Sequence, residues 1–285
     1  MTIDLVFITY NRPEYTKLSL KRLLDTCDES MRVWVWHNGT DEETLEIVQS
    51  FQDHPSFFKF HHSIENKKLN EPTNWLWTHA KGDFLSKVDD DCLMPYDWAN
   101  VLRKAHADVP EFGVIGCWRF PKEDFIPELA NKKIRQLTGG HRLMQNCWIE
   151  GSGYLMKREC LKVNGLLRSA ETFTDYCIRL ANKGWINGWY YPFLYQEHMD
   201  DPRSPNTLLK SDDDFKRYLP LTARNFGLGS LDEWSEQLRN SAVVCQTANI
   251  NPKLYIGWRG RLRRIRRRII RKVEKIVRRN KQDNK

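Results

Sequence analysis

The first third of the chain contains four mainly apolar runs. They lie at 3–9, 33–36, 57–60 and 84–88, and polar residues or glycine follow each of them within a few positions. Runs of this length, without strict alternation of apolar and polar residues, are typical of strands buried on both faces. The pattern therefore predicts four strands that lie inside a sheet rather than at its surface.

The segments between these runs carry helix signals. Pro13 stands near the first position of one predicted helix, a position that proline favours. Acidic residues at 41–43 open a second helix, where the helix dipole favours them, and 71–80 forms a third. Strands that alternate with helices at this spacing predict an α/β fold with a doubly wound, mostly parallel sheet and right-handed crossovers.

Beyond residue 95 the pattern predicts further strands and helices. In order, we expect a helix at 96–107, a strand at 112–118, a return to the sheet at 148–156, helices at 159–163 and 174–183, an apolar run at 189–195, and helical structure across 205–247. The polar and basic segment 120–145 contains Gly139-Gly140 and is predicted to be an irregular insertion over the functional site.

Composition places the chain among globular proteins. It has 285 residues, of which 40% are hydrophobic and 29% charged, which is enough apolar material for a large core. No apolar run is long enough to span a bilayer, and we expect no secretion signal at the N-terminus. The seven scattered cysteines form no Cys-x-x-Cys pair, which favours reduced thiols in the cytosol over a zinc site.

The net charge of +8 is unevenly distributed. Residues 253–285 carry +13, so the remaining chain carries −5, the difference from +8. In this basic tail, apolar residues recur every three or four positions between arginines, as in Trp258, Leu262, Ile265 and Ile269 with Arg264 and Arg268. An amphipathic helix of this kind lies well in an anionic membrane interface. The alternatives are a helix packed on its own catalytic domain and an arginine-rich RNA-binding helix.

Three consecutive carboxylates, Asp89-Asp90-Asp91, follow the fourth apolar run. Ligands of open α/β sheets bind at the carboxyl ends of strands, and carboxylate oxygens suit Mg²⁺ or Mn²⁺. In an extended segment Asp89 and Asp91 point the same way, so they are candidates to share one ion. The alternative is a solvated acidic turn. A second triplet, Asp212-Asp213-Asp214, is interpreted instead as the first turn of a helix.

An ordered set of short motifs resembles the GT-A glycosyltransferases, specifically glycosyltransferase family 2. The set consists of Ile8-Thr9-Tyr10-Asn11-Arg12-Pro13-Glu14, Asn38-Gly39-Thr40-Asp41, Asn66, Asn74, Ala80-Lys81-Gly82-Asp83, Asp89-Asp90-Asp91, Gly151, Lys157-Arg158-Glu159, Asp175, Arg179-Leu180, Gly184-Trp185 and His198. No single motif is specific to this family. Their order and spacing over roughly residues 1 to 200 are what make the set specific. The resemblance implies a GT-A (Rossmann-like) fold, a nucleotide-sugar donor, Mn²⁺ or Mg²⁺, and inversion at the anomeric carbon.

The resemblance also implies roles for individual residues. The nucleotide-sugar set is Thr9, Tyr10, Arg12, Asn38, Asn74, Asp89 and Asp90, with Thr9, Tyr10 and Arg12 lining the base and ribose pocket. The metal set is Asp91, His198 and Asp89. Glu150, Gly151, Trp118 and Trp148 are candidates for contacts with the sugar or acceptor, although a core position is favoured for Trp118, and Glu150 could equally form a strand-end salt bridge.

The chain departs from the family pattern at the general base. The expected acidic pair falls on Thr172-Phe173, and neither residue can accept a proton as a carboxylate does. An acceptor hydroxyl is a poor nucleophile, so a carboxylate on a second element must take its proton during attack on an oxocarbenium-like centre. Asp175 and Glu171 are the neighbouring carboxylates, and we favour Asp175.

These observations predict a peripheral enzyme of the inner membrane face that builds a surface polysaccharide or lipopolysaccharide on a glycan or lipid-linked acceptor. The expected division is 1–204 as the catalytic domain, with a nucleotide half to about 118 and an acceptor half from 119, then a helical extension at 205–252 and the tail helix at 253–285. Nucleic acid is not the expected partner. The rival interpretations are a non-catalytic body with a nucleic-acid-binding tail, and a nucleotidyltransferase.

Overall fold

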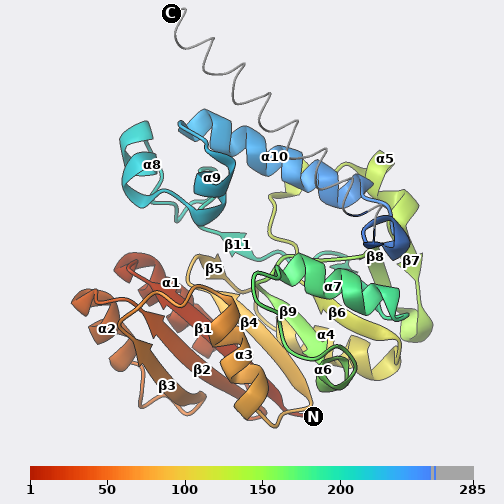
Figure 1. Cartoon of the computed structure of the whole chain (residues 1–285), viewed down its shortest axis with the longest axis horizontal. Helices are drawn as coiled ribbons and strands as arrows, with labels where there is room; N and C mark the ends of the chain where they lie inside the picture. The colour runs from red at the N-terminus through yellow and green to blue at the C-terminus, as the bar shows by residue number, and fades with distance from the viewer. Residues whose placement is uncertain (258–259, 261–285) are drawn as a thin grey trace, which may run out of the picture.

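A computed structural model of the chain describes residues 1–257 and residue 260. Its centre is a nine-stranded sheet with the strand order β3-β2-β1-β4-β9-β6-β10-β8-β7. A separate two-stranded ribbon pairs β11 with β5. In Figure 1 this ribbon lies between the sheet and a layer of C-terminal helices.

The first half of the sheet is parallel, as predicted. Its strands are β1 (Ile3–Tyr10), β2 (Met31–Asn38), β3 (Phe57–Ser63) and β4 (Phe84–Asp89). The connecting helices are α1 (Pro13–Asp25), α2 (Glu42–Gln49) and α3 (Asn70–His79). Strand β1 is flanked by β2 and β4, both parallel to it, and Ile8 is level with Asp89. The carboxyl ends of β1 and β4 therefore meet at one edge.

The second half mixes strand directions. Strand β9 (Tyr154–Lys157) runs antiparallel to both β4 and β6 (Phe112–Gly116), and β10 (Ile186–Tyr191) is parallel to β6. Helix α4 (Trp98–Asp108) precedes β6, and α6 (Arg158–Asn164) and α7 (Phe173–Asn182) follow β9. The predicted strand at 148–156 is thus shorter and starts later than expected.

The prediction of an irregular insertion at 120–145 was wrong. The segment forms η1 (Lys122–Asp124), α5 (Pro127–Ala130), η2 (Asn131–Lys133), β7 (Ile134–Gln136), η3 (Thr138–Gly140) and β8 (Arg142–Asn146). Strand β8 pairs antiparallel with β10, and β7 pairs with β8. The polar composition reflects the position of β7 at the edge of the sheet, where one side of the strand is unpaired.

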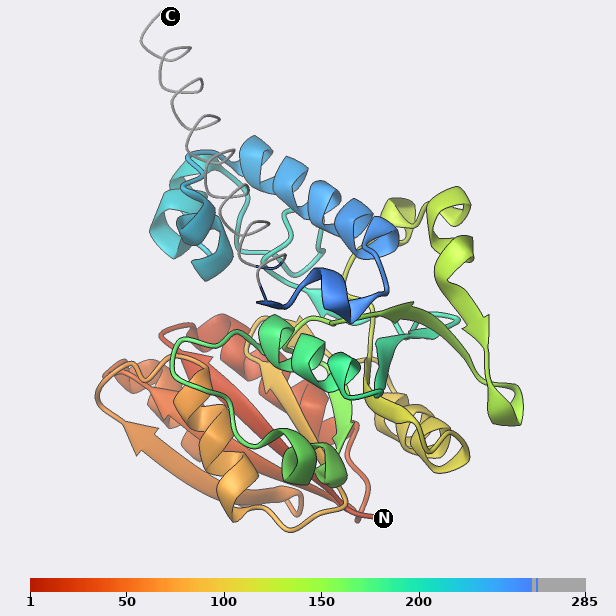
Figure 2. The same cartoon turned by 45° about the vertical axis from the view of Figure 1, so that its right-hand side comes forward.

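Helical layers cover both faces of the sheet. Alternate residues of β1 face opposite ways: Val6 and Ile8 pack with α3, α6 and α7, whereas Ile3, Leu5 and Phe7 pack with α1, α2 and α4. Figures 1 and 2 show these two layers on either side of the strands. Burial on both faces explains why the strands are almost continuously apolar.

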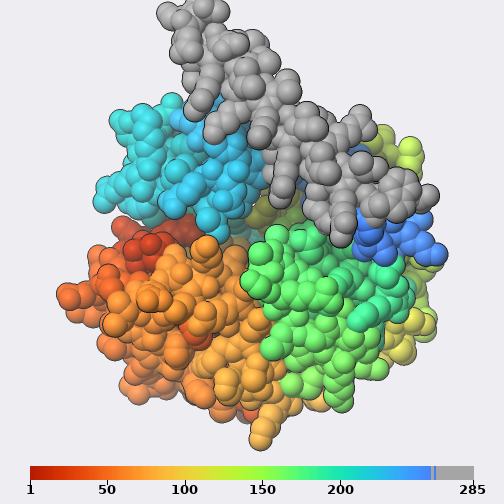
Figure 3. Space-filling model, viewed as in Figure 1, coloured from red at the N-terminus to blue at the C-terminus, as the bar shows by residue number. Residues whose placement is uncertain are grey.

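The C-terminal extension forms a third layer. It contains α8 (Asp212–Tyr218), α9 (Leu221–Phe226), α10 (Leu231–Thr247) and η4 (Pro252–Leu254), and its small core includes Phe215 and Trp234. Figure 3 shows these residues, in cyan and blue, lying over the sheet domain. The triplet at 212–214 occupies the first turn of α8, as predicted.

None of the helices formed by the described residues is long and apolar enough to cross a membrane. The predicted membrane-contacting residues, Trp258, Leu262, Arg264, Ile265, Arg268 and Ile269, lie outside the described residues.

Candidate functional site

The acidic triplet lies at a turn between two strands. Strand β4 ends at Asp89, Asp90 and Asp91 form the turn, and β5 (Cys92–Leu93) follows. Strand β5 pairs antiparallel with β11 (Glu197–His198), so that Cys92 is opposite His198. This ribbon brings a loop that is more than one hundred residues away in sequence against the acidic turn.

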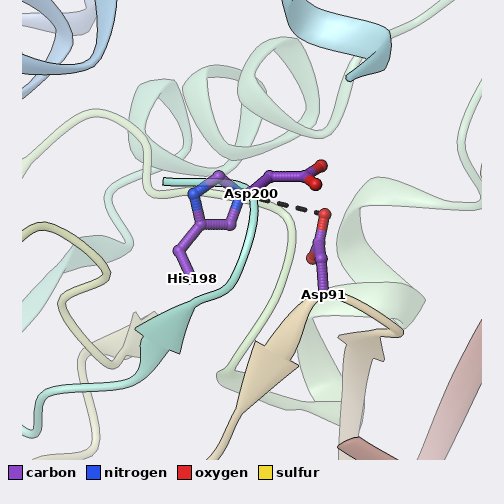
Figure 4. Close-up of side chains that lie close together, drawn as sticks. All are labelled: Asp91, His198 and Asp200. Atoms are coloured by element: carbon purple, nitrogen blue, oxygen red, sulfur yellow. Dashed lines mark ion pairs between the residues drawn. The ribbon is translucent and has the colours of Figure 1, made fainter. Parts of the chain in front are cut away.

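Asp91, His198 and Asp200 lie together as a candidate metal centre. Each offers one ligand atom, and the three atoms lie within 4.8 Å of one another. The His198 Nε2 atom is 3.8 Å from Asp91 Oδ2. Figure 4 shows Asp91 on the turn, with His198 and Asp200 reaching it from β11 and the loop that follows. Two carboxylates and one imidazole fit a divalent ion such as Mn²⁺ or Mg²⁺.

Sequence reasoning anticipated two of these three residues. Asp91 and His198 were expected to share an ion, and they lie close together. Asp200 was missed, although its position two residues after His198 is a signal that could have found it. Asp89, the third expected ligand, is instead paired with the Lys87 ammonium, and its backbone N–H donates to Ser152 Oγ at 3.0 Å. The chain turns after Asp89, so the strand alternation assumed for Asp89 and Asp91 does not extend to Asp91.

Arg12 lies in the middle of the acids. Its Nη1 donates to both oxygens of Asp200, at 2.9 and 2.8 Å, and its Nη2 donates to Asp90 Oδ1 at 3.0 Å and Asp91 Oδ2 at 3.4 Å. The guanidinium expected to line a base and ribose pocket is therefore engaged with carboxylates from two distant segments. It offsets part of the cost of burying three negative charges.

Burial sets the protonation of this cluster. Burial raises the pKa of Asp90 to about 7 and the pKa of Asp200 to about 6, although the Arg12 charge opposes both shifts. Burial also acts on Asp91, but the His198 ring and Arg12 hold its pKa below the usual range. Burial and the Arg119 charge lower the pKa of His198 to about 4, so the imidazole is neutral at pH 7 and keeps a lone pair for a metal.

Neighbouring elements fix the loop that carries His198 and Asp200. The Met199 N–H donates to the Asp91 carbonyl at 2.7 Å, and the Tyr15 hydroxyl donates to the Met199 carbonyl at 2.7 Å. Trp234 of α10 donates from Nε1 to the Asp200 carbonyl at 2.6 Å. The loop is thus held by the acidic turn, by α1 and by the C-terminal extension.

Of the other residues expected around the nucleotide, Thr9, Tyr10 and Asn38 lie at the ends of β1 and β2, whereas Asn74 lies within α3. Tyr10 is exposed, whereas Thr9 is buried with its hydroxyl 2.5 Å from that of Thr16. Asn38 uses its amide oxygen to accept from Trp36 Nε1 and from the Lys67 N–H. Asn74 joins its amide to both backbone groups of Leu167, so it holds a loop together.

The two candidate bases differ in their surroundings. Both carboxylate oxygens of Glu171 accept from Arg179, at 2.6 and 2.8 Å. Asp175 lies in the first turn of α7, where its Oδ2 accepts from the Thr172 hydroxyl at 2.9 Å. Phe173, at the position of the missing acid, stacks on Tyr154 with ring centroids 4.3 Å apart.

Of the four candidate sugar-contacting residues, two are buried and two are half-buried. Trp118 is fully buried and stacks on Phe193 at 4.7 Å, which favours the core interpretation over a sugar platform. Trp148 is also buried and packs edge-on against Tyr255. Glu150 accepts from Trp189 Nε1 at 2.7 Å and from the Cys245 thiol at 3.4 Å, and within the described part of the chain it forms these hydrogen bonds and no salt bridge. Gly151 lies against Phe173.

Comparisons with known proteins agree with this architecture. The uncharacterized glycosyltransferase YfnE of Bacillus subtilis (strain 168) is 29% identical over 170 residues, covering 55% of this chain and 43% of that protein. The chain therefore spans less than half the length of this curated relative.

Two solved structures share the fold. The mannosyltransferase PcManGT from Pyrobaculum calidifontis, in complex with GDP-Man and Mn²⁺, is 18% identical with a TM-score of 0.57 and covers 88% of this chain and 76% of its own. S. aureus TarS 1-349 in complex with UDP-GlcNAc is 17% identical with a TM-score of 0.53, covering 90% and 75%. At these identities the likeness concerns the fold, and it confirms the predicted GT-A architecture.

The family model described as "Glycosyl transferase family 2" matches residues 4–162, which include the acidic turn and the strands that support it. Since this match covers more than half of the 285 residues, the chain belongs to glycosyl transferase family 2.

Proposed function

We propose that the chain is an inverting, divalent-metal-dependent glycosyltransferase that moves a sugar from a nucleoside-diphosphate sugar to a hydroxyl of a glycan or lipid-linked acceptor. The single observation that carries this proposal is the Asp91, His198 and Asp200 cluster at the carboxyl end of β4, in a chain of this family. This edge of an α/β sheet is where such folds bind ligands.

The residues of the cluster fit the proposed ion. Asp91 and Asp200 supply oxygen ligands from two segments, and the neutral His198 ring supplies a nitrogen. A bound Mn²⁺ or Mg²⁺ would provide Lewis-acid stabilisation of the diphosphate that leaves. Arg12, which contacts both carboxylates, keeps them oriented toward the same point.

The carboxylate that takes the acceptor proton is proposed to be Asp175. Glu171 is the alternative, but its two oxygens are committed to Arg179, and a carboxylate paired in this way is a weaker base. Asp175 forms one side-chain hydrogen bond, to Thr172, and keeps an oxygen for an incoming hydroxyl. Both carboxylates stand on a different element from the metal ligands, as attack from the side opposite the leaving group requires.

A panel of nucleotide sugars tests the proposal. UDP-, GDP- and dTDP-sugars are added with and without Mn²⁺, with a CMP-sugar as the monophosphate comparison, and the unfolding temperature is measured. One donor should raise the unfolding temperature only when Mn²⁺ is present, because a ligand that binds the folded state stabilises that state. Asp91→Asn should abolish this shift. Asp213→Asn removes the same charge from an exposed side chain of α8 and should leave it intact. If no donor shifts the wild type, or if Asp91→Asn behaves like it, the proposal is wrong.

We further propose that the enzyme works at the cytosolic membrane face on a surface polysaccharide or lipopolysaccharide, attached by its basic tail. The charge of +13 on residues 253–285 supports this, because each basic residue near an anionic surface contributes roughly 1 kcal/mol.

Vesicle flotation with anionic and neutral lipids tests the attachment. The full chain should float with anionic vesicles, and a chain ending at residue 252 should stay in the bottom fraction of the gradient. Equal flotation of both chains would contradict the role of the tail.

A further inference from the structure

Among the described residues, three arginines lie around the candidate metal centre, and two of them pair with carboxylates. Arg12 pairs with Asp90, Asp91 and Asp200. Arg203 forms two hydrogen bonds with the Asp124 carboxylate, both at 2.8 Å, and pairs with Asp201 at 2.7 Å. Neither guanidinium is available to a ligand without giving up a buried ion pair.

Arg119 is different. No hydrogen bond or ion pair to a carboxylate engages its side chain anywhere in residues 1–257, and its Nε–H is buried without a partner. Its contact is with the Phe120 ring, 5.1 Å from the guanidinium carbon. A buried donor left unpaired costs about 1–3 kcal/mol, so an arginine kept in this state calls for an explanation.

Backbone hydrogen bonds fix the position of the segment that carries Arg119. Trp118 donates its N–H to the Leu194 carbonyl at 2.8 Å and accepts from the Gln196 N–H at 3.0 Å, which ties the end of β6 to the segment leading into β11. Trp118 and Phe120 are both buried, and in an extended segment the residue between them points the opposite way. The Arg119 charge accordingly acts on Asp91 and His198, where it contributes to lowering the pKa of each.

We infer that Arg119 binds the phosphate farther from the nucleoside in a bound nucleoside diphosphate, an assignment that rests on the proposed function. Its planar fork matches two oxygens of one phosphate. The sheet order β1-β4-β9-β6 places Arg119, after β6, on the side of the cluster away from β1 and β2. A nucleoside held at β1 and β2 therefore presents its distal phosphate to Arg119.

Paired nucleotides test the assignment. UDP with UMP, GDP with GMP, and dTDP with dTMP are titrated into the full chain with Mn²⁺ present. The pair whose diphosphate binds the wild type most tightly is used for the variants. Arg119→Gln should weaken diphosphate binding about 10- to 100-fold, the range for a hydrogen bond to a charged group. Monophosphate binding should change less than about threefold. Arg119→Lys, which keeps the charge but loses the fork, should fall between the two.

The affinity for Mn²⁺ alone separates this role from a structural one. Removing a positive charge beside Asp91 and His198 should leave Mn²⁺ binding unchanged or tighter, whereas a damaged site would lose affinity for metal and nucleotide together. Lys122→Gln is the control: it removes one exposed positive charge three residues away and should leave the diphosphate affinity at the wild-type value.

If the variants bind the diphosphate as the wild type does, or lose monophosphate and diphosphate affinity equally, the assignment is wrong. If Arg119→Gln does not fold, Arg119→Lys carries the same comparison. If the wild type binds none of the three diphosphates with Mn²⁺, the proposed function itself fails, and Arg119 is not the reason.

Discussion

At the scale of single residues, the site depends on buried charges that neutralise one another. Asp90 and Asp200 expose almost nothing, and Arg12 is their shared counter-ion. Removing one member of such a group leaves the others uncompensated, which is costly. For the same reason the carboxylates differ in role: Asp89 has its own partner in Lys87, whereas Asp91 and Asp200 share Arg12 and lie within reach of His198.

Two substitutions distinguish the ligand sets. Asp200→Asn should weaken Mn²⁺ binding by at least tenfold, roughly the lower end of the losses seen when partners of metal ligands are removed. Asp89→Asn should weaken it less than about threefold, because Asp89 lies outside the cluster. Binding is measured by calorimetric titration of Mn²⁺ into the protein without nucleotide. If Asp89→Asn loses more Mn²⁺ affinity than Asp200→Asn, then Asp89 is the metal ligand and Asp200 is not.

At the scale of elements, helix α10 supports the loop that carries His198 and Asp200 from outside the sheet. Trp234 is buried in the small core of the extension, and its indole N–H reaches the backbone of Asp200. The same helix holds the segment after β6, since Gln246 accepts from the Ile126 N–H at 2.7 Å and donates to the Asp124 carbonyl at 2.8 Å. The extension at 205–252 is therefore part of the site's scaffold.

Trp234→Phe isolates this support. It removes one buried hydrogen bond, worth about 1 kcal/mol, and frees the Asp200 backbone, so Mn²⁺ affinity should fall about three- to tenfold. Ser230→Ala is the matched control, because it removes the N-cap of the same helix at a cost of about 1 kcal/mol without touching the loop. Calorimetric titration and urea unfolding are run on both variants. The idea fails if both lose stability but neither loses Mn²⁺ affinity.

At the scale of the whole molecule, His106 links the two halves of the sheet. It lies on α4, with its ring 5.2 Å from that of Phe84 in β4 and 5.9 Å from that of Phe112 in β6, and Nε2 is 3.0 Å from the Leu155 carbonyl in β9. Burial lowers the pKa of His106 to about 3, although the hydrogen bond to Leu155 opposes this shift. The native state therefore holds the ring neutral at this junction.

Acid should destabilise the fold through this residue. The ordinary pKa of 6.5 applies in the unfolded chain, so between pH 6.5 and 3 the unfolded state binds a proton that the native state does not. Stability from this residue is complete above pH 6.5 and is lost as the pH falls, by about 2 kcal/mol between pH 7 and 5. In urea unfolding at both pH values, His106→Leu should show a decrease smaller by that amount. An equal decrease in both proteins would exclude His106 as the cause.

The predictability of the molecule differed between its halves for a physical reason. Strands β1 to β4 are buried on both faces and follow one another in sequence, so their apolar runs and intervening helices indicate the parallel order directly. Strand β7 is the edge strand and β8 lies next to it. Strand β8 pairs antiparallel with β7 and with β10, which comes about forty residues later in the sequence. In β7 Arg135 and Gln136 are exposed, and in β8 the apolar run is only Leu143 and Met144, so periodicity did not mark either segment as a strand.

The sequence by itself determined the α/β class, the position of the acidic turn at the end of β4 and the choice of Asp91 and His198, because these follow from local patterning and from motifs in a fixed order. The tertiary structure alone decided that Asp200 joins them, that Asp89 does not, that Arg12 pairs with carboxylates, and that Arg119 has no hydrogen-bond or ion-pair partner among residues 1–257. Asp200 and Arg12 reach the acidic turn through contacts between residues far apart in sequence, which local patterning does not encode and which the β5–β11 ribbon brings together. Asp89 is drawn away by Lys87 and by the turn that follows it, and the bridge between Trp118 and Tyr195 sets the position of the neighbouring Arg119.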